Sequence, residues 1–283
     1  MIIVNFFGGF GNQLFQYAFG RAISKKFKIP FLIDKTLYSN KKNNFLLNNF
    51  NIKFDGFYNS FQNNKVQLFF LLIKSANIFD STKVYFEKFF HFDKNITKLD
   101  FYKKNYYFYG YWQSFKYFKN ILKELKNDLN FNSYISEYKS LLKNLRNTKN
   151  ISIHIRGGDY KLEPYLSFHG LLTAGYYNSA IDYFKKTNKL NDVFLFTDDV
   201  KHALKIARSF NFKYKLISSG KKNSSMTDFA LFYFSRNKVI SNSTFAWWSA
   251  ILSNNSHVIY PANWFKSKKL ETKDLFPKNW KKL

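Results

Sequence analysis

The sequence predicts an α/β protein with two compact domains and parallel sheets. Its 283 residues are enough for two domains of roughly 100 to 200 residues each. The chain opens with a strand, a glycine loop and a helix. Its second half alternates strands and helices in the way that a parallel sheet requires. We place the two domains at residues 1–148 and 149–283.

The first predicted strand, residues 2–7, leads into the loop Gly8-Gly9-Phe10-Gly11-Asn12-Gln13 and a helix from about residue 14 to 27. A glycine loop before a helix N-terminus is a ready site for an anion or a polar ligand. Leu14 replaces the third glycine of the dinucleotide fingerprint, so that motif is absent. A purely structural tight turn is the alternative, and the two amide side chains of the loop favour ligand contact.

The rest of the first half contains fewer clear elements. The aromatic strand at residues 106–112 either packs in the sheet core, which we favour, or stacks against a sugar ring. The polar run at residues 146–150 is unpatterned and marks the domain boundary. The other elements expected here are a strand at 29–34, loops over 39–64, a buried helix or strand at 66–76, and amphipathic helices at 115–129 and 134–145.

The second half has the clearest strand pattern. Polar side chains stand at the ends of three of its strands: His154 with Arg156, Asp198 with Asp199, and Ser243 with Thr244. Because the carboxyl ends of parallel strands meet at one edge, these loops can converge on one ligand. The expected strands are 151–155, 193–197, 215–217, 238–240 and 257–260, and the expected helices begin near Thr173, Lys201, Ser224 or Ser225, and Phe245.

The polar groups at these strand ends suit a nucleoside diphosphate. Arg156 can form paired charge-assisted bonds with phosphate oxygens. Ser243 and Thr244, at a helix start, add hydroxyl and backbone donors. A carboxylate at Asp198 suits N–H donors or ribose hydroxyls. A metal at Asp198 and Asp199 is the minority interpretation, because no D-x-D sequence and no histidine cluster accompanies them, and we expect no metal site.

Charge restricts the classes of partner. The chain has 45 Lys and Arg residues against 18 Asp and Glu, a net charge of +27, which favours nucleic acid, an anionic membrane or sugar-nucleotide phosphates. The lysines are scattered, no nucleic-acid motif is present, and the bias extends to Asn, Phe, Tyr and Ile, so we expect no nucleic-acid partner. The absence of cysteine excludes disulfides and a cysteine nucleophile.

The sequence favours a cytoplasmic protein. No signal-peptide pattern stands at its start, and no apolar run approaches the roughly 20 residues needed to span a bilayer. The lysine-rich end carries Trp264, Phe265 and Trp280, which could support peripheral contact with the anionic inner face of the cell membrane. A solvated tail is equally compatible with this composition.

Four motifs in order carry a family resemblance. They are Gly9-Phe10-Gly11-Asn12-Gln13-Leu14-Phe15-Gln16-Tyr17-Ala18, His154-Ile155-Arg156-Gly157-Gly158-Asp159-Tyr160, Phe196-Thr197-Asp198-Asp199 and Ser241-Asn242-Ser243-Thr244-Phe245-Ala246-Trp247-Trp248. With them the chain resembles glycosyltransferase family 11, the α-1,2-fucosyltransferases. The resemblance implies a GT-B architecture, with two Rossmann-like domains facing across a cleft.

The resemblance also implies an activity. It is the inverting, metal-independent and cofactor-free transfer of L-fucose from GDP-β-L-fucose to the 2-hydroxyl of a terminal galactose. The acceptor would be a free or lipid-linked glycan, and the reaction would belong to surface polysaccharide or lipopolysaccharide synthesis. The first domain would then lie on the acceptor side, and the second would hold the GDP-sugar.

Residue roles follow from the same resemblance. Arg156 would grip the β-phosphate, and His154 and Asp198 would lie near the guanosine. Ser243, Thr244 and Phe245 would bound the phosphates, and Asn12, in a loop with Gly9, Gly11 and Gln13, would reach the phosphates or the fucose. We assign catalytic roles to Arg156, Asn12 and Asp159. By nearness in sequence, the candidates for general base are Asp159, Glu163 and His169.

One position departs from the family pattern. The family motif reads H-x-R-R-G-D-Y, and this chain has Gly157 in place of the second arginine. The substitution removes a positive charge near the leaving group. It therefore leaves two alternatives open: a different GDP-sugar donor on the same fold, and a catalytically inactive protein that binds glycan or nucleotide.

Overall fold

The computed structural model describes residues 1–283 except 39–43, 59–81, 189, 219–224, 254–256 and 268–269. The helix or strand expected at 66–76 lies outside the described residues. The chain forms two compact units, Met1–Leu129 with Glu271–Leu275, and Asn130–Leu270 with Phe276–Leu283. The boundary thus lies at 129/130 rather than 148/149. The reason is that Phe131 packs against Phe229 and Tyr233, with ring centroids 4.8 and 5.4 Å apart.

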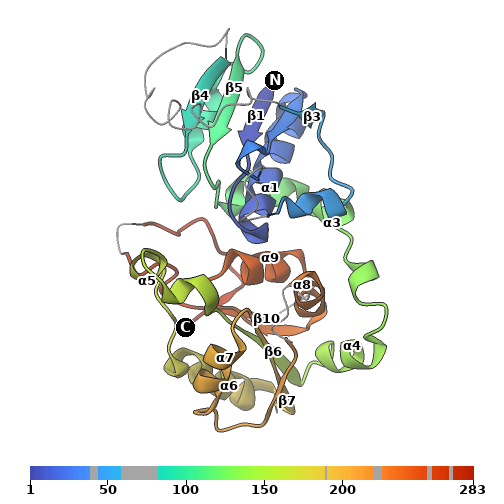
Figure 1. Ribbon diagram of the computed structural model, residues 1–283, viewed down its shortest axis with the longest axis vertical. Coiled ribbons are helices and arrows are strands. Elements are labelled where there is room, and N and C mark those ends of the chain that lie inside the picture. Colours follow the sequence, from blue (N-terminus) through green and yellow to red (C-terminus); the bar gives the residue numbers. More distant parts are fainter. Residues whose placement is uncertain (39–43, 59–81, 189, 219–224, 254–256, 268–269) are drawn as a thin grey trace. The chain divides into compact units, whose positions relative to one another are not determined.

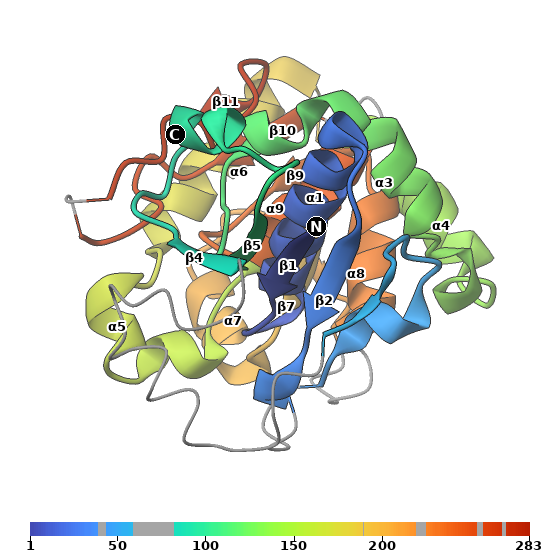
Figure 2. The same ribbon diagram turned by 90° about the horizontal axis from the view of Figure 1, so that it is seen from above.

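Unit 1 contains a parallel sheet with helix α1 (Phe10–Phe27) packed against it (Figures 1 and 2). Within the described residues its strand order is β3-β2-β1-β5-β4. Ile2 pairs with both Phe31 and Tyr106, which makes β1 the central strand. The strands are β1 (Ile2–Asn5), β2 (Phe31–Asp34), β3 (Gly56–Phe57), β4 (Thr82–Phe86) and β5 (Asn105–Tyr109).

Helix α1 is buried along most of its length. It begins at Phe10, one turn earlier than expected, because the Gly9 carbonyl accepts the amides of Asn12 and Gln13 at 2.9 and 3.1 Å. At Gly20 a Cβ would lie 2.4 Å from the Phe31 ring, so glycine permits close approach to β2. The helix therefore serves as the core of unit 1.

The helix expected at 115–129 is shorter in the structure. Only α3 (Leu122–Asp128) is α-helical, because Phe118 leaves the helical conformation at φ −129° and is fully buried, with its ring 5.9 Å from that of Phe15. Likewise α4 covers only Lys139–Leu145. The 3₁₀ turns are η1 (Thr36–Tyr38), η2 (Leu46–Asn49), η3 (Lys94–Lys98), η4 (Phe115–Tyr117), η5 (Lys119–Ile121), η6 (Asn132–Tyr134) and η7 (Gly158–Lys161).

Unit 2 contains a second parallel sheet, with the order β11-β10-β9-β6-β7-β8 in the described residues. Read in chain order from β6, this is the 3-2-1-4-5-6 arrangement of the Rossmann fold. All five strands expected in this half are present. The strands are β6 (Asn150–Ile155), β7 (Asp192–Thr197), β8 (Tyr214–Leu216), β9 (Asn237–Val239), β10 (His257–Tyr260) and β11 (Lys281–Lys282).

Helices cover both faces of this sheet (Figure 1). Ile151, Ile153 and Ile155 of β6 pack in one cluster with α6 and α7, and His154 points to the opposite face, with its ring near Phe232 of α8 and Phe245 of α9. The alternation of β6 therefore separates a purely apolar face from a face that carries the histidine. The helices are α5 (Tyr165–Phe168), α6 (Ala174–Asn188), α7 (Val200–Ala207), α8 (Ser225–Phe234) and α9 (Thr244–Leu252).

The C-terminal end of the chain corrects one expectation. Trp264, Phe265 and Trp280 are buried, with 3, 7 and 9% of their surface exposed, so their rings belong to the core and are not available for a membrane surface. Lys281 and Lys282 form β11 beside β10, which the sequence pattern did not predict. No helix in the described part of the chain has the length and apolar character to cross a bilayer.

Candidate active site

The predicted site residues of unit 2 lie at one edge of the sheet. The strand order is β9-β6-β7, all parallel, so the three polar loops follow adjacent carboxyl ends, as the strand pattern predicted. The chain leaves β6 towards β7 on one side and comes back to β9 on the other. Open α/β sheets bind ligands at such a switch point. The predicted site residues therefore lie at the position where this fold favours a binding site.

Hydrogen bonds join the loops that follow β6 and β9. Nδ1 of His154 lies 2.7 Å from Oγ of Ser241, and the hydroxyl of Tyr160 donates to the carbonyl of Asn242 at 3.3 Å. Nδ2 of Asn242 in turn donates to the carbonyl of His169 at 3.0 Å. These contacts hold the two loops together, so the groups they carry are placed before any ligand arrives.

Arg156 is the cation at this edge. Its guanidinium contacts Oδ2 of Asp198 at 2.6 Å, forms an ion pair with Asp159, and lies 4.7 Å from the centre of the Tyr160 ring. Burial alone would lower the pKa of Arg156, but Asp198, Tyr160 and Asp159 raise it by more, so the pKa lies above its ordinary value. The side chain is 23% exposed, which leaves this fixed positive charge within reach of an anion.

Two glycines bring the β6 loop against the two carboxylates that follow β7. The amide of Gly157 donates to Oδ1 of Asp198 at 2.9 Å. A Cβ at Gly157 would lie 2.6 Å from Cβ of Asp199, and one at Gly158, where φ is +43°, would lie 2.4 Å from Oδ2 of Asp198. Both positions therefore need glycine for close approach. The departure from the family motif at residue 157 has a local packing reason.

Asp199 has a structural role. Its side chain accepts the amide of His202 at 3.0 Å, which caps α7, and it forms an ion pair with Lys161. Burial alone would raise the pKa of Asp199, but the bonds from Lys161 and His202 lower it by more. Asp199 is therefore ionised, and its carboxylate binds Lys161 and the His202 amide. Of the two carboxylates, Asp198 is the one that contacts Arg156.

His154 is neutral at physiological pH. Only 3% of its surface is exposed, and burial, with a smaller contribution from the Arg156 charge, lowers its pKa to about 3. Its ring centroid lies 5.6 Å from that of Phe245. A buried neutral imidazole that is hydrogen-bonded to Ser241 supports the loops and does not have the pKa of a general base near neutral pH.

The N-terminus of α9 supplies donors on the β9 side. Ser243 occupies the N-cap position with extended dihedral angles, and its side chain makes no capping hydrogen bond. Ser243 is buried, whereas Thr244 and Phe245 are half-exposed. The first amides of a helix point out of its N-terminus and carry partial positive charge. This end of α9 can therefore accept an anion beside Arg156.

The three base candidates differ in their contacts. Asp159 is 50% exposed and pairs with Arg156. Glu163 accepts the amide and hydroxyl of Ser167 at 3.1 and 2.8 Å, so it caps α5. The His169 ring stacks on Tyr160 with centroids 4.3 Å apart, and burial lowers its pKa to about 4. Of the three, Asp159 is the carboxylate that touches Arg156.

In unit 1 the glycine loop and α1 place the other predicted residues at the carboxyl end of β1. Gly9 is exposed, with no atom within 4 Å of the position that a Cβ would take, whereas Gly11 is buried. Asn12 is half-exposed, and its Oδ1 accepts a hydrogen bond from Gln113 at 3.2 Å. Gln13 is fully buried and binds the carbonyl of Asn44 and the amide of Leu46, both at 2.9 Å. Gln13 thus shapes the loop, and Asn12 is the amide at the surface.

Two residues at these edges were not singled out by the sequence. Tyr160 supports the Arg156 guanidinium with its ring and binds the Asn242 carbonyl with its hydroxyl. Gln113 orients the Asn12 amide across 101 residues of sequence. Tyr160 ends the motif His154–Tyr160 and could have been found there, but the pairing of Gln113 with Asn12 depends on β1 and β5 being neighbours.

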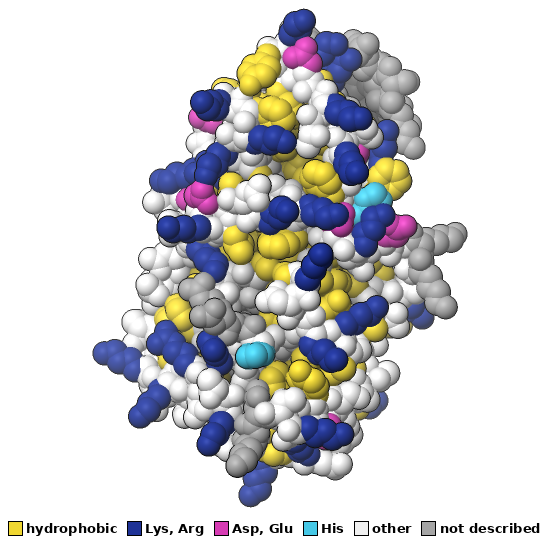
Figure 3. All heavy atoms as spheres, turned by 180° about the vertical axis from the view of Figure 1, so that it is seen from behind, with side chains coloured by type: hydrophobic (Ala, Val, Ile, Leu, Met, Phe, Trp, Pro, Cys, Tyr) yellow, Lys and Arg dark blue, Asp and Glu magenta, His cyan; other side chains and the backbone are white. Residues whose placement is uncertain are grey.

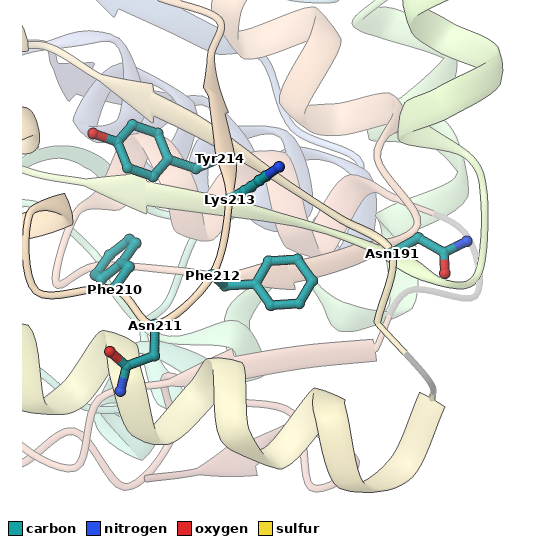
Figure 4. A pocket seen from close by; sticks show the side chains of 6 residues that line it. All are labelled: Asn191, Phe210, Asn211, Phe212, Lys213 and Tyr214. Carbon is teal, nitrogen blue, oxygen red and sulfur yellow. The ribbon is translucent and has the colours of Figure 1, made fainter.

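Two cavities in unit 2 are lined by described residues. One, of about 750 Å³, is lined by residues after β10 and at the start of α6, among them Gly170, Thr173 and Ala262. The other, of about 850 Å³, is lined by Asn191 and residues 210–214 (Figure 4). These residues precede β7 and β8, so the second cavity lies at the edge opposite Arg156 and contains no predicted site residue. Among the described residues, no group of three or more His, Asp or Glu side chains could hold a metal ion.

Charge is spread widely over the face in Figure 3, where Lys and Arg side chains are separated by apolar and neutral polar ones. They do not gather into a single stripe on the described residues of that face. The charge on this face is therefore diffuse, which agrees with the scattered lysines of the sequence.

A model of glycosyl transferase family 11 matches residues 1–283 of the sequence. The chain belongs to this family. Among its relatives is an α-1,2-colitosyltransferase of Escherichia coli, 29% identical over 99% of this chain and 98% of the relative. Another is the O-antigen biosynthesis glycosyltransferase WbnK of Escherichia coli, 31% identical over 91% of this chain and 93% of the relative.

Solved structures confirm the fold of this family 11 protein. Arabidopsis thaliana FUT1 in complex with GDP superposes with a TM-score of 0.55 at 12% identity, covering 99% of this chain and 75% of that one. The α-1,6-fucosyltransferase NodZ from Bradyrhizobium, co-crystallised with GDP, gives a TM-score of 0.51 at 14% identity, covering 89% and 92%. The expected α/β class of GT-B type, with two Rossmann-like units, is confirmed.

Proposed function

We propose that the protein transfers L-fucose from GDP-β-L-fucose to the 2-hydroxyl of a terminal galactose on a surface glycan, with inversion and without a metal ion. The observation that carries this proposal is Arg156, a partly exposed guanidinium at the switch point of a Rossmann-like sheet in a family 11 glycosyltransferase. GDP-bound neighbours with the same fold support the nucleotide, and the O-antigen relative supports the glycan.

The diphosphate of the donor would lie between Arg156 and the N-terminus of α9. In the reaction the bond between C1 of the sugar and the β-phosphate oxygen breaks, and GDP leaves with the electron pair. The acceptor oxygen forms a new bond to C1 from the opposite face and loses its proton. The negative charge that develops on the β-phosphate is stabilised by the guanidinium and by the first amides of α9. His154 and Asp198 would lie near the guanosine.

Asp159 connects donor binding to the fate of the acceptor proton. In the structure its carboxylate pairs with Arg156. A diphosphate that takes this position on the guanidinium releases the carboxylate, which is half-exposed and can then accept a proton. Asn12 would approach the phosphates or the fucose with its amide. The catalytic set of the proposal is thus Arg156, Asp159 and Asn12.

A second donor has a specific observation in its favour. One relative is named as a colitosyltransferase, and colitose is L-fucose without its 3-hydroxyl group. Gly157 removes a cationic side chain from the phosphate-binding loop and leaves its amide on Asp198. A donor with a different deoxyhexose would fit the same diphosphate site. A catalytically inactive protein that binds glycan or nucleotide is the remaining alternative.

A GDP-release assay tests the proposal and separates these alternatives. Purified protein is given GDP-fucose, GDP-colitose and GDP-mannose in turn, with a panel of β-galactosides as acceptors and EDTA present. Release that needs both GDP-fucose and acceptor, and a product with an α-1,2 linkage by NMR, is the expected result. Turnover with GDP-colitose alone would reassign the donor. Tight GDP binding with no turnover by any donor would contradict the enzymatic proposal.

A further inference from the structure

A cluster of half-exposed aromatic rings lies at the carboxyl edge of the unit 1 sheet. The Phe7 ring, just after β1, stacks on Tyr109 at the end of β5 with centroids 5.2 Å apart, and lies 4.6 Å from the Tyr111 ring. Phe86 contacts Tyr109 at 5.8 Å, and Phe90 lies parallel to Tyr111 at 6.3 Å. All five rings are half-exposed. We call them the aromatic platform.

The platform differs from the aromatic core directly beneath it. Phe6 and Phe108 precede two of its members in sequence and are fully buried. Half-exposed rings at the ends of β4 and β5 thus lie beside fully buried ones, at the edge where parallel sheets bind ligands. In the aromatic strand, Tyr106 and Tyr107 are buried in the core, the interpretation that we favoured, whereas Tyr109 and Tyr111 are half-exposed.

The carboxylate of Glu87 fixes the loop that carries Tyr111. Glu87 accepts the amides of Tyr111 and Trp112 at 2.7 and 2.9 Å. A Cβ at Gly110 would lie 2.4 Å from Cβ of Glu87, so glycine is needed there. Burial raises the pKa of Glu87 to about 7, against the lowering effect of these amides. The carboxylate is thus used to shape the loop.

The backbone of the same loop is strained at Trp112. Trp112 has a φ of +59°, in the left-handed region that a bulky residue rarely adopts, and its ring is fully buried against Phe19 with centroids 4.3 Å apart. Such strain persists only where the surrounding structure fixes it, and it is concentrated at functional sites. This turn separates Tyr111, whose ring lies 4.6 Å from that of Phe7, from Gln113, whose Nε2 donates to Oδ1 of Asn12 at 3.2 Å.

We propose that the aromatic platform is the subsite for the acceptor sugar, with a pyranose ring lying against Tyr111 and Phe7. The apolar C–H face of a pyranose matches the electron-rich face of an aromatic ring. This inference rests on the proposed glycosyl transfer and names the side chains of unit 1 that hold the acceptor.

The test uses the full-length protein with three variants of matched design. Tyr111→Leu removes the ring and keeps the apolar bulk, and Tyr111→Phe keeps the ring. Tyr102→Leu is the control, because Tyr102 is 80% exposed in the same unit and does not contact the platform. The probes are methyl β-D-galactoside and lactose, observed by saturation-transfer difference NMR with GDP present. Acceptor and donor KM are measured by GDP release.

Tyr111→Leu is expected to remove the saturation signals of the pyranose C–H protons and to raise the acceptor KM about tenfold, with donor KM and GDP affinity unchanged. Tyr111→Phe should retain these saturation signals, because it keeps the ring, and Tyr102→Leu should behave as wild type. Equal acceptor signals in Tyr111→Leu and wild type, or no signal in wild type, would overturn the inference. So would an equal loss of GDP affinity, since the platform would then hold the nucleotide. The NMR readout needs no turnover, so acceptor binding without transfer by any GDP-sugar would reject the proposed function and leave the platform intact.

Discussion

The Cβ that any other residue would carry at Gly157 would lie 2.6 Å from Cβ of Asp199. Asp199 cannot easily move, because it caps α7 and pairs with Lys161. The position of Asp199 therefore requires glycine at residue 157. Restoring the arginine of the family motif would push the β6 loop away from β7, the strand that carries Asp198. The missing arginine is thus more than the loss of one charge.

This contact predicts a stability change that depends on position. Gly157→Ala should lower the free energy of unfolding by about 1 to 3 kcal/mol, as overpacking of a tight contact does. Gly175→Ala in α6 is the matched control, because a Cβ there would meet its nearest neighbour at an ordinary 3.5 Å, and alanine should be neutral or stabilising. Urea denaturation measures both. Equal stability of the two variants would show that the close contact at residue 157 relaxes without cost.

Arg156 should be sensitive even to a conservative change. Arg156→Lys keeps the charge and loses the planar fork, so we expect kcat to fall about 100- to 1000-fold, and Arg156→Ala should nearly abolish transfer. Circular dichroism should show an unchanged fold. Arg208→Lys, an exposed substitution at the end of α7, serves as the control. Near-normal turnover of Arg156→Ala would refute the role of the guanidinium.

Asp159 should affect donor binding and turnover in opposite directions. Asp159→Asn removes the negative charge that competes with the diphosphate for Arg156, so GDP should bind several-fold more tightly. Turnover should fall because the proton acceptor is lost. Calorimetry with GDP and steady-state kinetics measure the two effects. Glu163→Gln should change neither, since Glu163 binds Ser167. Weaker GDP binding by Asp159→Asn would contradict this account.

His154 predicts how stability changes in acid. Its folded pKa of about 3 lies below the ordinary value of about 6.5, so the folded state binds fewer protons between these values. The stability is therefore fully present above about pH 6.5 and is lost as the pH falls towards 3, by about 1.4 kcal/mol per pH unit at most. His154→Gln should have a shallower decline of the urea midpoint between pH 7.5 and 5. His169→Gln tests the smaller contribution of His169.

Much of unit 2 could be predicted from its sequence, because each strand is an apolar run followed by a turn or a polar loop. The convergence of Arg156, Asp198 and Ser243 followed from the parallel arrangement alone. Their pairing could not be predicted. The alternation of a strand places a side chain on one face of the sheet. It does not predict that Asp198 lies 2.6 Å from Arg156, or that the Asp199 side chain caps α7.

Unit 1 was harder to predict because its contacts join residues far apart in sequence. The amide of Phe115 donates to the carbonyl of Asp274, and the Asp274 side chain accepts the amide of Phe92 at 3.1 Å. No local pattern signals such contacts. The sequence also did not show which aromatic residues are buried. Tyr107 and Tyr109 are both tyrosines in β5, but Tyr107 is buried and Tyr109, the last residue of the strand, is half-exposed.

The return of residues 271–275 to unit 1 has a consequence for biosynthesis. The chain passes from one unit to the other at 129/130, at 270/271 and again at 275/276. During synthesis residues 1–129 emerge from the ribosome long before residues 271–275, so Phe92 and Lys116 lack their contacts with Asp274 until that segment has also emerged. Unit 1, whose synthesis begins first, therefore cannot be completed before residue 275 has emerged. A stop codon directly after residue 270 would remove residues 271–275 from unit 1 and residues 276–283 from unit 2, so it would truncate both units.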